Sequence, residues 1–539
     1  DFIGPASGLL FTLENIIWIN LGVFIGCVFA AIPGLSVILC IILFLPVTYT
    51  MKAIPGMMFL LGIYCAGGYG GSVSAILINT PGTPHAAATM LDGHPLSKMG
   101  RTKAALKIAL YASTFGGIFS ALVLLFLGPQ VAKISAQLGT AEYFMVCLFG
   151  MTIIAGVSGK SLVKGIIAAC LGLLISCVGA DPMTSYDRFT FGIPRLYLGL
   201  DLAVTLIGLF ALVEIIGKAE LKHSELNLHA GKIGNDDGKI TKDEYKRMLR
   251  PVLIGSIIGS CVGIVPGTGA SEASWFSYNT AKNLSKHPEE FGTGIPDGIW
   301  APEVANNASV GGAVIPMIAL GIPGDGTTAM LLGGLTIHGI QPGPTMFTKQ
   351  GVMAYTIIVG CLVANVLLAP LGLGMTRIVA KIVQVRYTYL APVIIMFCFA
   401  GAFAATGNTK ELILCAGILI FSYILTVLDI DNTPLMLGMI LEDIMEQNFV
   451  TASMSYDRNY SIFLTRPISA VILIITIVLL VSMIRVNRRV AKLNEEQERY
   501  YNLVSFQDVT HIWCIPVSCS NEEYAGILLE AFAEESSDT

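Results

Sequence analysis

The sequence predicts an all-α, polytopic membrane protein with roughly 11 to 13 spans. The first observation is composition: 54% of the 539 residues are hydrophobic, only 13% are charged, and the mean hydropathy is +0.72. Soluble domains carry about 25% charged residues. The second is the recurrence of long apolar runs, and the third is a pair of sequence repeats that each carry a Pro-Gly-broken segment.

The apolar runs are long enough, or nearly so, to cross a hydrocarbon core of roughly 30 Å as helices. They cover residues 16–32, 35–50, 104–128, 196–217, 352–372, 387–407, 409–428 and 466–486. Most of the twelve cysteines lie inside such runs, which predicts small buried hydrophobes and not a disulfide framework.

The distribution of basic residues predicts which loops face the cytoplasm and where the chain divides into two halves. Lys and Arg gather in residues 98–107, 160–164, 218–250, 377–386 and 485–492. The positive-inside rule places all of these in the cytoplasm. We therefore predict a first repeat at 1–217, a cytoplasmic polar linker at 218–250, a second repeat at 251–487 and a polar C-terminal tail at 488–539.

The two halves repeat the same broken segments. "GVFIGCVFAAIPG" at 22–34 aligns with "GSIIGSCVGIVPG" at 255–267, a constant offset of 233 positions. "GSVSAILINTPGT" aligns with "GAVIPMIALGIPGD" at an offset of 242 positions across the Pro-Gly pair. The residues expected to break the helices are Pro33, Gly34, Pro81, Pro266, Gly267 and Pro323.

The repeat orientation depends on residues 71–90. If this segment crosses the membrane, the N-terminus is inside and the repeats are parallel. If it forms a re-entrant hairpin, the N-terminus is outside and the repeats are inverted. Pro81 and Pro84 would interrupt a crossing helix, which favours the hairpin.

Interrupted backbone at membrane depth is tolerated only where it is buried in protein or lines a polar cavity. Free helix N-termini attract anions there, and free carbonyls hold cations. We therefore expect "INTPGTP" (the first tip, residues 78–84) and "LGIPGDGTTA" (the second tip, residues 320–329) to meet at one binding site. The alternative is a pair of purely structural helix breaks.

A third polar segment, 300–316, carries a carboxylate and two amides between apolar neighbours. Glu303 and Asn307 are four positions apart, so they share a helix face with Asn306 beside them. Ionisable residues at membrane depth are functional candidates, which singles out Glu303 and Asp325. The alternative for Glu303 is a carboxylate at a helix end in the interface.

Other classes of function lack their motifs. "GVSGKS" at 156–161 has Ile154 where a phosphate loop requires glycine. The histidines lack metal-ligand spacing, and no GxSxG nucleophile motif occurs, so neither a metal site, another cofactor nor an enzyme is expected. Basic runs are confined to loops beside membrane spans, which argues against a nucleic-acid partner.

The chain resembles the large membrane subunit of bacterial tripartite tricarboxylate transporters, the TctA type, from about residue 10 to 490. The segments that carry the resemblance are "IPGLSVILCIILFLPVTY", "YGGSVSAILINTPGTPHAAATMLDGHPLSKMGR", "VPGTGA", "EEFGTGIPDGIWAPEVANNASVGGAVIPMIALGIPGDGTTAMLLGGLTIHGIQPGP" and "IFLTRPISA".

The resemblance implies a secondary active transporter in the bacterial cytoplasmic (inner) membrane. It would import citrate-like tricarboxylates or dicarboxylates, coupled to Na⁺ or H⁺. Its partners would be a small membrane subunit of about four spans and an extracytoplasmic solute-binding protein. A passive anion channel or pore is the alternative.

Carried onto this sequence, the resemblance assigns substrate binding to the two tips: Asn79, Thr80, Gly82, Thr83, Gly324, Gly326 and Thr327. Cation coupling or support of the site falls to Asp325, Glu303, Asn306 and Asn307. The family often has a small polar residue after the second Pro-Gly. The acidic Asp325 departs from that pattern, which favours a cation or proton role for it over direct substrate contact.

The tail departs from the family after about Asn487. "YYNLVSFQDVTHIWCIPVSCSNEEYAGILLEAFAEESSDT" is similar to a piece of a bacterial solute-binding lipoprotein. Basic residues at 485–492 predict that this tail lies in the cytoplasm. A segment of this length cannot form that domain's core, so we expect a fusion with little function. The alternative is a cytoplasmic helix that docks on the partner subunit.

Overall fold

The computed structural model describes residues 2–157, 161–181, 184–219, 238–382 and 387–485. The chain divides into Asp1–Leu480, which holds the helical bundle, and Val481–Thr539. The predicted tail at 488–539 and residues 220–237 of the predicted linker lie outside the described residues.

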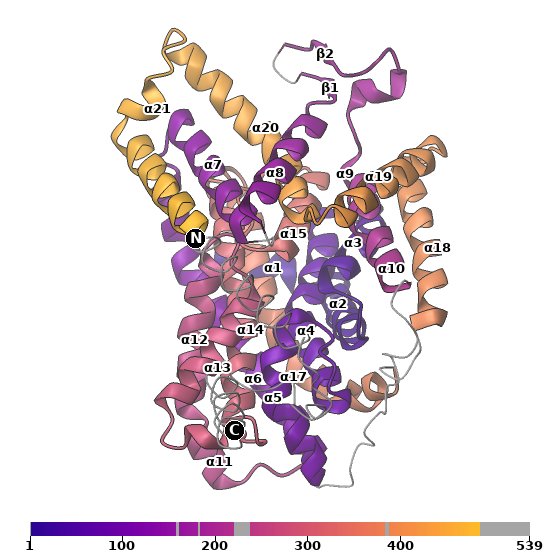
Figure 1. Ribbon diagram of the computed structural model, residues 1–539, viewed down its shortest axis with the longest axis vertical. Coiled ribbons are helices and arrows are strands. Elements are labelled where there is room, and N and C mark those ends of the chain that lie inside the picture. Colours follow the sequence, from indigo (N-terminus) through magenta and orange to yellow (C-terminus); the bar gives the residue numbers. More distant parts are fainter. Residues whose placement is uncertain (1, 158–160, 182–183, 220–237, 383–386, 486–539) are drawn as a thin grey trace, which may run out of the picture. The chain divides into compact units, whose positions relative to one another are not determined.

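The first half folds as helices over the predicted apolar runs (Figure 1). Its elements are α1 (Ile3–Leu10), α2 (Leu13–Ala31), α3 (Val37–Thr48), α4 (Ala53–Ile78), η1 (Pro84–Ala86), α5 (Ala87–Leu96), η2 (Ser97–Arg101), α6 (Thr102–Ser135), α7 (Thr140–Val157), α8 (Leu162–Ser176), β1 (Gly179–Ala180), β2 (Asp187–Arg188), η3 (Pro194–Leu198), α9 (Leu202–Leu206), η4 (Ile207–Ala211) and α10 (Leu212–Ala219). The antiparallel pair β1–β2 is the only sheet within the described ranges.

The second half has the same broken-helix pattern near its start. Its elements are α11 (Lys242–Arg247), α12 (Leu249–Ile264), α13 (Ala270–Leu284), η6 (Pro288–Glu290), α14 (Asp297–Leu320), α15 (Gly326–Ile337), α16 (Met346–Lys349), α17 (Gly351–Ile382), α18 (Tyr387–Thr406), α19 (Lys410–Val427), α20 (Asn432–Ser455) and α21 (Ile462–Thr465). A further helix covers Pro467–Arg485.

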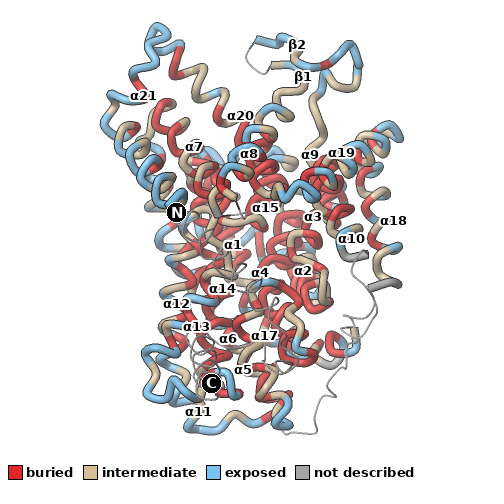
Figure 2. Tube along the Cα trace, viewed as in Figure 1, coloured by how far each residue is buried: buried red, intermediate tan, exposed pale blue. Residues whose placement is uncertain are grey.

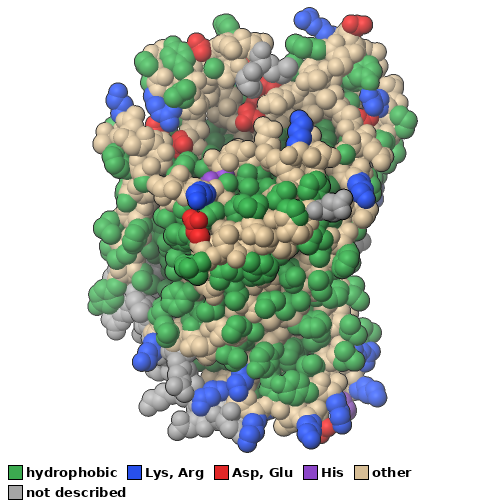
Figure 3. All heavy atoms as spheres, turned by 180° about the vertical axis from the view of Figure 1, so that it is seen from behind, with side chains coloured by type: hydrophobic (Ala, Val, Ile, Leu, Met, Phe, Trp, Pro, Cys, Tyr) green, Lys and Arg blue, Asp and Glu red, His purple; other side chains and the backbone are tan. Residues whose placement is uncertain are grey.

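The helices confirm an all-α polytopic membrane protein. Eight helices in the described part of the chain are long and apolar enough to cross a membrane, and shorter apolar helices accompany them. Figure 3 shows hydrophobic side chains covering the middle of one face, with Lys and Arg at its lower end and others scattered over its upper part. The helix in the apolar run 35–50 is shorter than expected. It covers only Val37–Thr48, or about 18 Å, which is less than the thickness of a hydrocarbon core.

The sequence repeat is also a repeat of contacts between helices. In the first half, a methyl group on Gly26 would lie 2.4 Å from the carbonyl oxygen of Ile63. In the second half, a methyl group on Gly259 would lie 2.4 Å from the carbonyl oxygen of Ala305. These residues correspond at the two offsets found in the sequence, 233 and 242 positions. Glycine at both places lets α2 pack on α4 and α12 pack on α14 with their backbones in contact.

The contacts give the relative direction of the two repeats. On α4, Ser72 meets Glu303 of α14, whereas Gly68, one turn earlier, meets Asn307, one turn later. The equivalent helices α4 and α14 therefore run in opposite directions. Within each half, α2 runs parallel to α4 and α12 parallel to α14, as successive glycine contacts show. These contacts favour the inverted arrangement of the repeats.

Each half has two Pro-Gly breaks, and the first and the second require glycine for different reasons. Gly34 and Gly267 have φ of 93° and 84°, a left-handed backbone that favours glycine. Gly82 and Gly324 are required by space, since a Cβ would lie 2.0 Å from the Ala30 carbonyl oxygen and 2.5 Å from the Ala313 Cα, respectively.

The first tip is bonded back to α4, and the second tip is bonded to the Pro-Gly break after α12. The amide of Gly82 donates to the Gly71 carbonyl (3.1 Å), and the amide of Gly267 donates to the Gly324 carbonyl (2.8 Å). These bonds satisfy part of the backbone that the helix breaks release, as burial at membrane depth requires.

We expect Gly26→Ala and Gly259→Ala each to destabilise the protein by roughly 1–3 kcal/mol, because the added methyl collides with a helix backbone. The matched control is Gly374→Ala in α17, where a Cβ meets nothing within 4 Å. Thermal unfolding of the purified protein in detergent measures the change. Equal midpoints for all three variants would contradict the inferred close packing.

Candidate functional site

The two tips reach the same face of α4 from opposite ends. A Cβ on Gly71 would lie 2.0 Å from the Thr83 Oγ1, so the first tip rests on Gly71. The Tyr64 hydroxyl donates to the Asp325 Oδ2 at 2.9 Å, which joins the second tip to the same helix. Positions 64 and 71 are seven residues apart, so they share a helix face and lie about 10 Å apart along its axis.

Two asparagines of α14 lie between the tips. A Cβ on Gly68 would lie 2.9 Å from the Asn307 Oδ1 and 3.1 Å from the Asn306 Nδ2. Both asparagines are buried, and Figure 2 shows that α4 and α14 are buried along most of their length. Glycine at position 68 lets the two amides approach α4, which places polar groups between the tips.

Several polar atoms of this region have no hydrogen-bond partner within the described part of the chain. They are Thr83 Oγ1, Asn306 Nδ2, Asn307 Oδ1 and Asn365 Oδ1. A buried polar group without a partner costs about 1–3 kcal/mol. Such atoms are therefore suited to a bound polar ligand or to ordered water.

Glu303 is fully buried, with hydroxyl donors from three helices. Its Oε2 accepts from Ser72 of α4 (2.5 Å) and Thr89 of α5 (2.8 Å). Its Oε1 accepts from Ser113 of α6 (2.7 Å). No Lys, Arg or His forms an ion pair with Glu303 among the residues that the structure describes. A carboxylate in this setting is stabilised when it binds a proton or a cation.

Asp325 has a clear structural role as the N-cap of α15. Its Oδ1 accepts from the Thr328 amide and the Thr328 hydroxyl, each at 2.7 Å. The Thr328 hydroxyl accepts in turn from the Asp325 amide at 2.8 Å, which completes a capping box. With Tyr64 on Oδ2, both carboxylate oxygens are hydrogen-bonded within the protein. This geometry is adequate to explain the acidic residue without a ligand.

A helix starts at each tip, and the positive end of the second, α15, is already capped by the Asp325 carboxylate. α15 begins at Gly326 beside Asp325, and η1 and α5 begin after Thr83. The first turn of a helix leaves backbone amides free and carries the positive end of the helix dipole. The face of α4 between positions 64 and 71 is therefore flanked by two helix N-termini.

Not all the predicted tip residues reach this face. Asn79 is the exposed C-cap of α4, with φ of 55°, and Thr80 follows it outside the buried region. Gly324 packs on Ala313, and a Cβ on Gly326 would lie 3.0 Å from Ile38 of α3. Thr327 is buried in the first turn of α15. The structure thus brings Gly82, Thr83, Asp325 and the two asparagines of α14 to the face of α4.

The sequence reasoning missed the polar residues on the surrounding helices: Tyr64, Ser72, Thr89, Ser113 and Asn365. Asn365 could have been found, because it is a lone amide in the apolar run 352–372. The hydroxyl residues could not, since Ser and Thr are common in membrane helices and only the fold brings them to Glu303.

Asp92 is a second buried carboxylate that the sequence did not single out. Its Oδ1 accepts from the amides of Gly292, Gly294 and Ile295 at 2.8–3.0 Å, and its Oδ2 accepts from the Tyr278 hydroxyl at 2.9 Å. These bonds fasten α5 to the segment that leads into α14. Asp92 therefore positions the helix that follows the first tip against the helix that carries Glu303.

Paired broken helices in two repeats, with buried polar side chains where they meet, are typical of membrane transporters built from repeats. The profile of the tripartite tricarboxylate transporter TctA family matches residues 16–437. The chain belongs to this family, which is a family of transporters and not of enzymes, and it is a transporter subunit that crosses the membrane several times.

The chain is also similar to two proteins of Agrobacterium vitis. An uncharacterised 52.8 kDa protein from the region 3′ of ttuC′ in TAR-I is 33% identical over 464 residues, which cover 86% of this chain and 91% of that protein. An uncharacterised protein from the corresponding region of TAR-II is 35% identical over 217 residues, covering 40% of this chain and 89% of that protein. No solved structure matches the chain.

We expect Asp325→Ala to lower the free energy of unfolding by about 1 kcal/mol, because α15 loses its N-cap. Asparagine caps helices about as well as aspartate, so Asp325→Asn should unfold close to the unmodified protein. Thermal unfolding in detergent measures both. If the asparagine variant were as unstable as the alanine variant, the negative charge and not the cap would be the structural requirement.

Proposed function

We propose that this chain imports carboxylate anions, citrate-like tricarboxylates or dicarboxylates, by coupling to a cation gradient. The observation that supports this most is the group of unpartnered polar atoms of Thr83, Asn306 and Asn307 between two helix N-termini. The helix start after Thr83 and the side-chain amide donors suit a carboxylate, and no Lys or Arg side chain contacts the site among the residues that the structure describes. Membership of the family supports the substrate class.

In this proposal the substrate is bound by the inner parts of the tips. Thr83 and Asn306 would donate to a carboxylate of the substrate, and Gly326 and Thr327 would support it from the first turn of α15. Gly82 and Gly324 hold the tips against α4 and α14, where a side chain would displace them. Asn79 and Thr80 remain predictions from the resemblance, with no contact to this face that supports them.

Glu303 is the residue we assign to the coupling cation, Na⁺ or H⁺. It is the carboxylate that lies closest in sequence to the two asparagines, and the three hydroxyls that donate to it are neutral. The Asn307 amide donates to the Glu303 carbonyl at 3.3 Å, so the cation site and the substrate site share one helix turn. Binding of a cation at Glu303 would lower the cost of placing an anion beside Asn306.

The partners and location follow from the same proposal. The chain would work in the bacterial cytoplasmic membrane with a small membrane subunit and an extracytoplasmic solute-binding protein, and the basic loops would face the cytoplasm. The binding protein would supply much of the selectivity among carboxylates.

The test is uptake of radiolabelled citrate and dicarboxylates into proteoliposomes that contain the chain, the small subunit and the binding protein. An imposed Na⁺ or proton gradient should drive accumulation above equilibrium, and the gradient that drives it identifies the cation. We expect Thr83→Val and Asn306→Leu to reduce uptake by roughly tenfold or more, since each removes a hydrogen bond to a charged group. Thr348→Val, an exposed threonine of α16 outside both tips, is the matched control.

The same assay separates coupling from binding. Glu303→Gln should abolish accumulation against a gradient while substrate still equilibrates across the membrane; Glu289→Gln, an exposed carboxylate, should have no effect. Uptake by the unmodified proteins that never exceeds equilibrium would contradict cation coupling and indicate a passive channel. Full accumulation by the Thr83 and Asn306 variants would move the substrate site elsewhere.

A further inference from the structure

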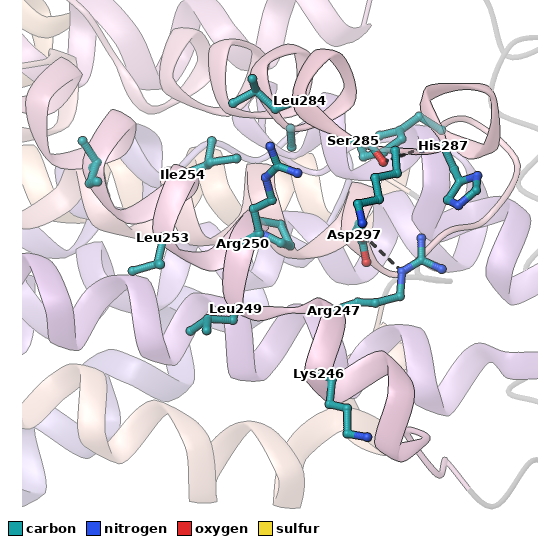
Figure 4. A pocket seen from close by; sticks show the side chains of 15 residues that line it. Lys246, Arg247, Leu249, Arg250, Leu253, Ile254, Leu284, Ser285, His287 and Asp297 are labelled. Atoms are coloured by element: carbon teal, nitrogen blue, oxygen red, sulfur yellow. Dashed lines mark hydrogen bonds and ion pairs between the residues drawn. The ribbon is translucent and has the colours of Figure 1, made fainter.

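A cavity of about 770 Å³ lies at the end of the bundle formed by α11, α12, α13 and the start of α14 (Figure 4). Its lining has two parts, an apolar wall and a cationic rim. The wall includes Leu249, Leu253, Ile257 and Leu284, and the rim includes Arg250 and Lys286. It is separate from the site between the tips.

The apolar wall continues onto the outer surface of a membrane-crossing helix. Leu249, Leu253 and Ile257 are spaced four apart on α12 and are 63%, 49% and 58% exposed. They belong to the apolar helical stretch Lys242–Ile264, which is long enough to cross the membrane. Together they form a stripe of about 12 Å along the helix axis. A surface of this kind contacts lipid chains in a bilayer.

The rim carries positive charge that the protein does not neutralise. Arg247 is used within the protein, since it forms ion pairs with Glu290 at 3.2 Å and with Asp297 at 3.6 Å. Figure 4 shows the Arg247–Asp297 ion pair among the residues that line the cavity. Arg250 and Lys286 form no ion pair or hydrogen bond with any residue that the structure describes.

We propose that this cavity binds an anionic phospholipid, with the phosphate between Arg250 and Lys286 and an acyl chain along Leu253 and Ile257. The complementary charge selects an anion, and basic pockets between membrane helices on the cytoplasmic side are suited to such head groups. The exposed apolar stripe selects a lipid over a free phosphate, because a soluble anion would leave that surface uncovered.

The position of the cavity couples it to the helix at the centre of the transporter. Asp297 lines the cavity and is the first residue of α14, which carries Glu303 and the two asparagines. A bound lipid would hold α11, α12 and α13 around the start of α14. We therefore expect anionic lipid to raise the thermal unfolding temperature of the full chain.

The experiment is native mass spectrometry of the delipidated full chain with phosphatidylglycerol and, separately, phosphatidylcholine of the same acyl chains. The unmodified protein should retain phosphatidylglycerol more tightly. Arg250→Gln and Lys286→Gln should each weaken binding by about fivefold. Lys282→Gln is the matched control, one turn earlier on α13 and outside the cavity lining.

A second pair of variants tests the apolar wall. Leu253→Gln should weaken binding of long-chain phosphatidylglycerol, whereas Leu373→Gln, an exposed apolar residue of α17, should not. Equal binding by the Arg250 variant and the unmodified protein would overturn the proposal. So would displacement of the lipid by inorganic phosphate with no dependence on acyl-chain length, which indicates a free-anion site. If the Arg250 and Lys286 variants bind lipid as the unmodified protein does but no longer copurify with the small membrane subunit, the cavity is instead a docking site for that protein partner.

Discussion

The crossing of α4 over α14 at Gly68 is the contact on which the central arrangement depends. It joins the two repeats in opposite directions and places Asn306 and Asn307 between the tips. One turn away, it also brings Ser72 to Glu303. A side chain at position 68 would separate the helices, and both the hydroxyl donors of Glu303 and the face shared by the tips would be lost.

The tips are tolerable inside a membrane protein because their backbone is bonded within the fold. The first tip returns to Gly71, and the second is fastened through Gly324 and through the Asp325 cap. Among the buried side-chain atoms that the structure describes near the tips, Thr83 Oγ1, Asn306 Nδ2 and Asn307 Oδ1 have no partner. Side-chain groups left free at this depth are polar capacity for a ligand.

Composition and the Pro-Gly repeats were sufficient to predict the all-α membrane fold, the repeat and the positions of the helix breaks. Glu303, Asn306 and Asn307 stand out in the sequence as polar residues of an apolar helix, and all three are buried in α14. The hydroxyls around Glu303 could not, since Ser72 and Ser113 are ordinary in membrane helices until packing brings them together. Pro81 and Pro84 indicated a break in the first tip, but the sequence could not show which tip residues lie on α4, because Asn79 ends that helix as an exposed C-cap while Thr83 folds back onto Gly71.

The most direct test of the central claim is a cryo-EM structure of the chain with its small subunit, determined with and without bound citrate or another transported carboxylate. The account predicts substrate density between Thr83 and Asp325, in contact with Asn306 and against the Gly68 face of α4. Well-defined substrate density away from both tips, with the asparagine amides bonded to other protein groups, would contradict it.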